Sequence, residues 1–97
     1  MAKKGSTMVM VGKAQAKFAV KAMHEANTLS RILEFFALND ITPATLQATK
    51  VGDGMQNIEV TCSDVDSRRA EIIANKIRQM VTVRTASLEV TYFQQAA

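Results

Sequence analysis

The sequence is poor in the residues that support cross-linking and catalysis. Its 97 residues include one cysteine, one histidine, one tyrosine, one proline and no tryptophan. A single thiol, Cys62, cannot form an intramolecular disulfide or a cysteine metal cluster, and such a chain is typical of a reducing cytoplasm. The apolar run Met8–Val11 is too short for a signal segment or a membrane span. We therefore expect a soluble cytoplasmic protein that does not bind membranes, with Cys62 as a small buried hydrophobic residue.

Motifs for catalysis are also missing. The sequence has no glycine-rich phosphate loop, no GxSxG, no HExxH and no paired metal-ligand motif. His24 has only Glu25 as a carboxylate close in sequence, and a histidine at a strand end is more often a turn or interface residue than a base. We expect a protein with no catalytic residues, no metal and no cofactor. A small enzyme that uses His24 as its base is the minority alternative.

The net charge of +3 is concentrated near the N-terminus. Residues 1–24 contain five lysines and no acidic residue, whereas residues 25–97 contain seven basic and nine acidic residues. The body of the chain is therefore mildly acidic, and nucleic acid is not expected as a partner. We interpret residues 1–13 as a basic, mobile tail, residues 14–93 as a single domain and residues 94–97 as a frayed C-terminus.

The first predicted elements are a strand and a helix. Lysines alternate with small or apolar residues over residues 13–23, which predicts a strand with one polar face. Asn27 and Thr28 are residues that cap helix N-termini. After them, apolar residues recur with helical spacing, and Asn39-Asp40 can adopt the left-handed conformation in which helices end. The predicted apolar stripe consists of Leu29, Ile32, Leu33 and Phe36.

The second half of the domain is predicted to be a hairpin, a helix and a final strand. Gly52-Asp53-Gly54 is the strongest hairpin signal, so strands at about 42–51 and 55–62 should pair antiparallel. Helix-start residues follow, and we expect a helix over about 65–80 and a last strand over 83–92. The expected helix stripe is Val65, Ile72, Ile73, Ile77 and Met80, and the inward strand residues are Ile58, Val60 and Cys62.

This order of elements predicts an α+β fold. A ferredoxin-like βαββαβ sandwich, with a four-stranded antiparallel sheet and two helices on one face, buries both helix stripes at once. We expect one core made of Phe36, Leu33, Ile73, Ile77, Val20, Ile58 and Leu88. The strand after Pro43 should lie at a sheet edge, and its centre has neither a lysine nor a bulge to protect it. We therefore expect a homodimer formed through this edge.

The turn before the first helix is the first candidate for a binding site. The N–H groups at a helix N-terminus can receive an anion or a carboxylate. In this interpretation Asn27 adopts a positive φ and its side chain fills part of the ligand space. A plain helix cap at Asn27 is the alternative. The strand MQNIEVTC has no aromatic residue for stacking RNA bases, and the turn HEANTL has no CxxC pair, so a small molecule or a protein is the expected ligand.

Three segments resemble the ACT regulatory domain, and more closely the small regulatory subunits of acetohydroxyacid synthase (acetolactate synthase). They are TLSRILEFFALNDI after the turn, QNIEVTC after the hairpin and NKIRQMVTVRTASLEV near the end. The resemblance runs from Phe18 to Tyr92. It implies a non-catalytic protein that modulates the thiamine-diphosphate-dependent large catalytic subunit in branched-chain amino-acid biosynthesis.

The resemblance also implies where an effector amino acid would bind. The corresponding positions in feedback-sensitive members align with His24 and Asn27 in the turn and with Thr42 at the start of the next strand. The candidate ligand-binding residues are therefore His24, Asn27, Thr28, Leu29 and Thr42. Many members have Pro-Gly where this chain has Ala26-Asn27. Because the Asn27 side chain would fill part of the ligand space, we expect weak or absent binding of valine, leucine and isoleucine. The alternatives are a free-standing amino-acid-sensing ACT module acting on another partner and, less favoured, a small ferredoxin-like enzyme.

Overall fold

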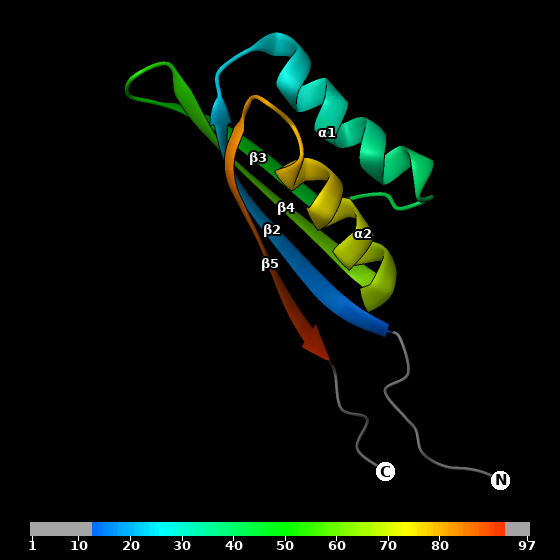
Figure 1. Ribbon diagram of the computed structural model, residues 1–97. Coiled ribbons are helices and arrows are strands. Elements are labelled where there is room, and N and C mark those ends of the chain that lie inside the picture. The colour runs from blue at the N-terminus through cyan, green and yellow to red at the C-terminus, as the bar shows by residue number, and fades with distance from the viewer. Residues whose placement is uncertain (1–12, 93–97) are drawn as a thin grey trace, which may run out of the picture.

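The computed structural model describes residues 13–92, which form six elements in the predicted order (Figure 1). The predicted basic tail, apart from Lys13, and the predicted frayed C-terminus lie outside these residues. The strands are β2 (Lys13–Met23), β3 (Thr45–Val51), β4 (Met55–Asp66) and β5 (Val83–Tyr92). The helices are α1 (Ala26–Leu38) and α2 (Ser67–Arg78), and neither is long and apolar enough to cross a bilayer.

The strands form one antiparallel sheet in the order β3-β4-β2-β5, and both helices lie on the same face of it (Figure 1). This arrangement confirms the predicted ferredoxin-like βαββαβ sandwich. The inner strand β2 pairs with β4 on one side and β5 on the other, and Phe18 is opposite Val60 of β4 and Leu88 of β5. Because residues opposite one another in a sheet point to the same face, the alternation of β2 defines the buried face of its neighbours as well.

Left-handed residues end the elements where the sequence predicted them. In the hairpin, Asp53 (φ 63°) and Gly54 (φ 69°) adopt positive φ in succession, the combination that a type I′ turn requires. Asn39 is the C-terminal cap of α1, and Asp40 has φ 57°. Both predicted chain reversals are confirmed.

The strand β4 is longer than predicted, and α2 is shorter. The pairing of β2 with β4 changes register between Ala14 and Ala16, and Asp64 on β4 has φ 54°. This bulge lets β4 continue to Asp66, so Val65 is a buried strand residue rather than the start of a helix. The Asp66 carboxylate then caps α2 by accepting from the Arg68 N–H at 2.9 Å.

The core agrees with the prediction at most positions and differs at two. Of the expected members, Phe36, Ile73, Ile77, Val20 and Ile58 are buried and Leu88 packs against them partly buried. The expected core position of Leu33 is wrong: Leu33 is half-buried, and its neighbour Ile32 is fully buried instead. Ile72, expected in the stripe of the second helix, is 46% exposed, because α2 packs through Ala70 and Ala74 beside the two buried isoleucines.

These positions make a matched test of the helix orientation. Ile32→Ala should lower the free energy of unfolding by about 2–5 kcal/mol, because it removes a fully buried side chain and leaves a cavity. Leu33→Ala removes atoms of similar volume from a half-buried position and should cost roughly half as much or less. Urea denaturation followed by circular dichroism measures both values. Equal losses in the two variants would show that the inward face of α1 lies between these residues.

Candidate functional site

The turn between β2 and α1 is held against the β3–β4 hairpin. The His24 N–H donates to the Gly54 carbonyl at 2.8 Å, and the Glu25 N–H donates to the Met23 carbonyl at 2.9 Å. The buried Gln56 side chain donates to the same Met23 carbonyl at 2.9 Å. The turn therefore has a fixed position relative to the hairpin, with both His24 and Glu25 exposed.

The capping role and the positive φ expected at Asn27 are wrong. The N-terminal cap of α1 is Glu25, whose backbone is extended (φ −130°, ψ 143°) and whose side chain makes no capping hydrogen bond. Asn27 lies within the first turn of the helix, and it is not among the described residues with positive φ. The helix begins earlier than predicted because Glu25 completes the turn from β2. A glycine at position 27 would therefore relieve no backbone strain.

Thr28, the second expected cap, instead joins α1 to the loop between α2 and β5. Its side chain is 1% exposed, and its hydroxyl donates to the Thr82 hydroxyl at 3.0 Å. The Thr82 carbonyl accepts from the Met23 N–H at 2.8 Å, so one loop residue is bound to both β2 and α1. Thr82 was not predicted from the sequence, because its partner Thr28 lies 54 positions away and neither residue belongs to a recognisable motif.

The remaining predicted site residues do not converge within one chain. Leu29 is half-buried and packs against the core. Thr42 is exposed and follows the opposite end of α1, whose 13 residues separate it from the turn by about 20 Å. One chain therefore brings together His24, Asn27 and Thr28 but not Thr42.

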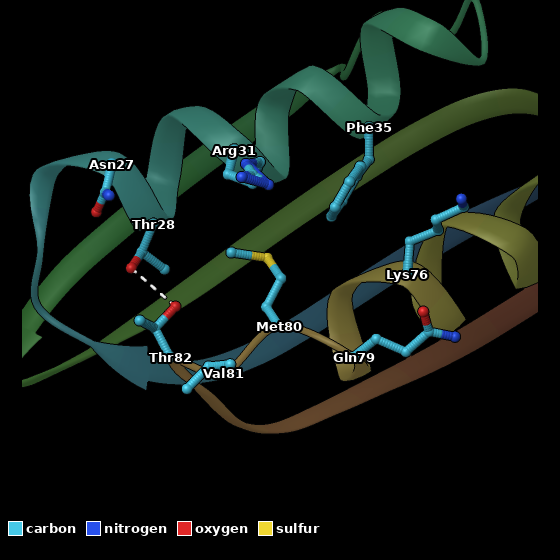
Figure 2. A pocket seen from close by; sticks show the side chains of 9 residues that line it. All are labelled: Asn27, Thr28, Arg31, Phe35, Lys76, Gln79, Met80, Val81 and Thr82. Carbon is cyan, nitrogen blue, oxygen red and sulfur yellow. Dashed lines mark hydrogen bonds between the residues drawn. The ribbon is translucent and has the colours of Figure 1, made fainter.

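A cavity of about 390 Å³ lies beside this turn, between α1, the end of α2 and the loop that leads into β5 (Figure 2). Arg31 and Phe35 extend into it from α1, and Lys76 and Met80 line the opposite wall. The Thr28–Thr82 hydrogen bond closes one end. The complete lining is Asn27, Thr28, Arg31, Phe35, Lys76, Gln79, Met80, Val81 and Thr82. Its polar groups are hydroxyls, amides and two cations, which suit binding by hydrogen bonds and charge.

Reactive side chains do not converge at the β2–α1 turn or in the cavity between α1 and α2. Burial raises the pKa of the Cys62 thiol from 9.0 to about 11, so this side chain is a poor nucleophile at neutral pH. Its predicted burial is confirmed, at 1% exposure. Across residues 13–92, no three histidine, cysteine, aspartate or glutamate side chains are grouped in a way that could hold a metal ion.

Comparison with known proteins identifies the family of this chain. A family model described as ACT-like domain matches residues 10–95 of this chain. No curated protein matches the chain.

Several solved structures have a similar fold. The ACT domain of GTP pyrophosphokinase from Chlorobium tepidum has a TM-score of 0.67 at 13% identity, covering 79% of this chain and 99% of that one. The C-terminal domain of the MgtC protein from Mycobacterium tuberculosis has a TM-score of 0.67 at 17% identity, covering 89% and 96%. A homoserine dehydrogenase from Thiobacillus denitrificans has a TM-score of 0.71 at 12% identity, covering 94% of this chain but 20% of that one. At these identities the similarity establishes the fold.

The hydrogen bond between the two threonines should contribute measurably to stability. Thr28→Val keeps the shape of the side chain but leaves the half-buried Thr82 hydroxyl without its partner, so we expect a loss of about 1–2 kcal/mol in urea denaturation. Replacing both threonines by valine should cost less than the sum of the single losses. Ser30→Ala, which removes an exposed hydroxyl that donates to the Asn27 carbonyl, is the control and should change stability by less than about 0.5 kcal/mol. Additive losses in the double variant would contradict an energetic link.

Proposed function

Because the chain belongs to the ACT-like domain family of small regulatory modules, we propose that it is a non-catalytic, cytoplasmic regulatory subunit of a biosynthetic enzyme. The partner we propose is the thiamine-diphosphate-dependent large subunit of acetohydroxyacid synthase, in branched-chain amino-acid biosynthesis. The segments that resemble its small subunits support this choice. In the structure they form most of α1, the inner part of β4, and the last turn of α2 with most of β5.

A regulatory subunit needs a surface that binds another chain, and the open edge strand β3 is the observation that supplies it. It is an edge strand, and Thr45 to Lys50 are exposed on both faces of the sheet. Leu46, opposite the buried Val60, is 41% exposed on the face that carries the helices. A strand with unpaired backbone groups and an incompletely covered apolar face is a template for another strand. We assign this edge to a second copy of the chain, which forms a symmetric homodimer.

The opposite edge of the sheet is less available for pairing. Arg78, at the end of α2, donates through Nε to the Ala86 carbonyl of β5 at 2.9 Å. Charged residues Arg84 and Glu89 are exposed along the same strand. Charged side chains and occupied carbonyls oppose edge-to-edge pairing. The contrast between the two edges therefore favours β3 as the dimer interface.

A dimer of this kind would complete the candidate effector site. If two β3 strands pair antiparallel about a twofold axis at Ala48, Thr45 of one copy faces Val51 of the other. Thr42 of the second copy then reaches the level of the hairpin turn, where the Gly54 carbonyl holds His24. The residues that one chain keeps apart, His24 and Asn27 on one side and Thr42 on the other, would meet between the two copies. An amino acid bound there would contact both chains.

A free-standing amino-acid-sensing module is the second candidate function. The similar structures leave room for it, since the fold also occurs in a GTP pyrophosphokinase and within a homoserine dehydrogenase and is therefore not tied to one enzyme. In that case the homodimer and the effector turn would be the same, but the controlled partner would differ.

The dimer can be tested with a single charge at the proposed axis. Ala48→Lys should dissociate the dimer, because two lysines would face each other across the axis, whereas the exposed position leaves the monomer fold intact. Sedimentation velocity at tens of micromolar measures the change in mass. Ser87→Lys, which adds the same charge at an exposed position on β5, is the matched control and should remain dimeric.

The pairing has a further signature. Ala48→Glu alone should also be monomeric, whereas an equimolar mixture of the lysine and glutamate variants should form a heterodimer, because opposite charges then meet. If the unmodified protein is a monomer, or if Ala48→Lys stays dimeric, the β3 interface is wrong.

The proposed partnership predicts an effect on enzyme activity. Adding the protein to the acetohydroxyacid synthase large subunit from the same host should change the rate of acetohydroxyacid formation, although the protein alone turns over no substrate. The Ala48→Lys variant should lose most of this effect if regulation requires the dimer, and Ser87→Lys should keep it. Activity assays on the purified components provide the measurement.

Two outcomes separate the candidate functions. No change in activity and no co-purification with a thiamine-diphosphate enzyme would rule out the synthase partnership. Calorimetric titration with the twenty amino acids then examines the sensor function, because saturable binding that is lost in Ala48→Lys would indicate an effector site between two copies.

A further inference from the structure

We propose that the cavity between α1 and α2 binds a small organic anion, a carboxylate or phosphate carried on an aromatic or branched aliphatic group. The cavity measures about 390 Å³ and is lined by residues of one chain. This volume is within the range of sites for small molecules, which are commonly about 300–1,000 Å³. The proposal does not depend on the dimer or on the enzyme partner, because no residue of a second copy is needed.

The charge of the lining selects an anion. Arg31 on α1 and Lys76 on α2 both line the cavity, and none of its nine lining residues is acidic. Two other arginines have partners, since Arg69 donates to the Asn39 carbonyl and Arg78 donates to the Ala86 carbonyl and the Asn75 side chain. Among residues 13–92, the side chains of Arg31 and Lys76 have no such hydrogen-bond partner. Their donors are therefore available to a ligand.

The apolar part of the lining defines the rest of the ligand. Figure 2 shows Phe35 pointing from α1 into the space between the helices and Met80 extending toward α1 below Arg31, and both side chains also pack against the core. An aromatic ring and a thioether form a surface suited to an aromatic or branched aliphatic group. Val81, 92% exposed, stands at the rim, where a bound ligand would cover part of it.

The helix ends determine how the anion is oriented. The N-terminus of α1, at Asn27 and Thr28, contributes positive potential on one side of the cavity. The C-terminal carbonyls of α2 near Gln79 contribute negative potential on the other side. The anionic group is therefore placed beside Arg31 and Asn27, and Lys76 supplies a second charge from across the cavity.

The experiment compares matched probes by amide chemical shifts in the ¹⁵N-labelled full chain. The probes are 3-phenylpropanoate and phenyl phosphate, with 3-phenylpropanamide as a neutral probe of similar shape. We expect the two anions to shift the amide signals of Arg31, Lys76 and Met80 saturably and the neutral probe to bind at least about tenfold more weakly. Raising the ionic strength should weaken the anions selectively, because salt screens the charge interaction.

Variants assign the effect to the two cations. Arg31→Gln and Lys76→Gln should each raise the Kd of the anions by about tenfold. Arg68→Gln removes the same charge from the opposite, N-terminal end of α2 and should leave the Kd unchanged. Melting temperatures of the three variants verify that the fold is retained, and Ala48→Lys should bind the anions normally.

Four outcomes would overturn the proposal. The first is that neither anion shifts the signals of the lining residues. The second is that the neutral probe binds as tightly as the anions, which would make the cavity a plain apolar pocket. The third is that Arg68→Gln weakens binding as much as Arg31→Gln and Lys76→Gln, which would indicate attraction to the overall basic surface. Loss of binding in Ala48→Lys alone would place the bound anion at the dimer interface and would also contradict the assignment.

Discussion

The edge-to-face contact between Phe18 and Phe36 joins the two layers of this protein. Their ring centroids are 5.0 Å apart at 84°, and both side chains are fully buried. Phe18 lies on the inner strand β2, which pairs with β4 and β5, so this contact fixes α1 to the middle of the sheet. Small residues at Ala16 and Ala22 on the same face leave room for the helices. The helices can then bury their apolar sides against one continuous surface.

Local signals were sufficient for most of the fold. The alternation of β2 and β5 and the Asp-Gly turn are short-range patterns with a direct physical cause, and the structure has them where they were predicted. The errors arose where distant packing decides between local alternatives. Ile32 and Leu33 are adjacent and equally apolar, so periodicity alone could not say which faces the core. The bulge that extends β4 depends on its pairing with β2, which the sequence of β4 does not encode by itself.

The candidate site was less predictable than the fold, because it too depends on packing between segments that are distant in the sequence. Asn27 and Thr28 were identified because they begin a helix, a local feature. Thr82 and Lys76 come from the other βαβ half, and their relation to α1 is created by packing of the two helices. The predicted location of Thr28 in the first turn of the helix is right, but its predicted role is wrong. Thr28 was expected to cap a helix, and it is instead a buried connection between α1 and the loop before β5.

One helix end belongs to both proposed sites. The first turn of α1 follows the β2–α1 turn, which we assign to the dimer-dependent effector site, and Asn27 and Thr28 also line the cavity toward α2. The position of this turn is fixed on one side by the His24 bond to the hairpin and on the other by the Thr28 bond to the α2–β5 loop. A ligand that displaces either bond changes the geometry presented to the other site. Coupling free energies between two binding sites are reciprocal. If the cavity ligand changes the affinity of the protein for the effector, the effector must therefore change the affinity of the protein for the cavity ligand by the same factor.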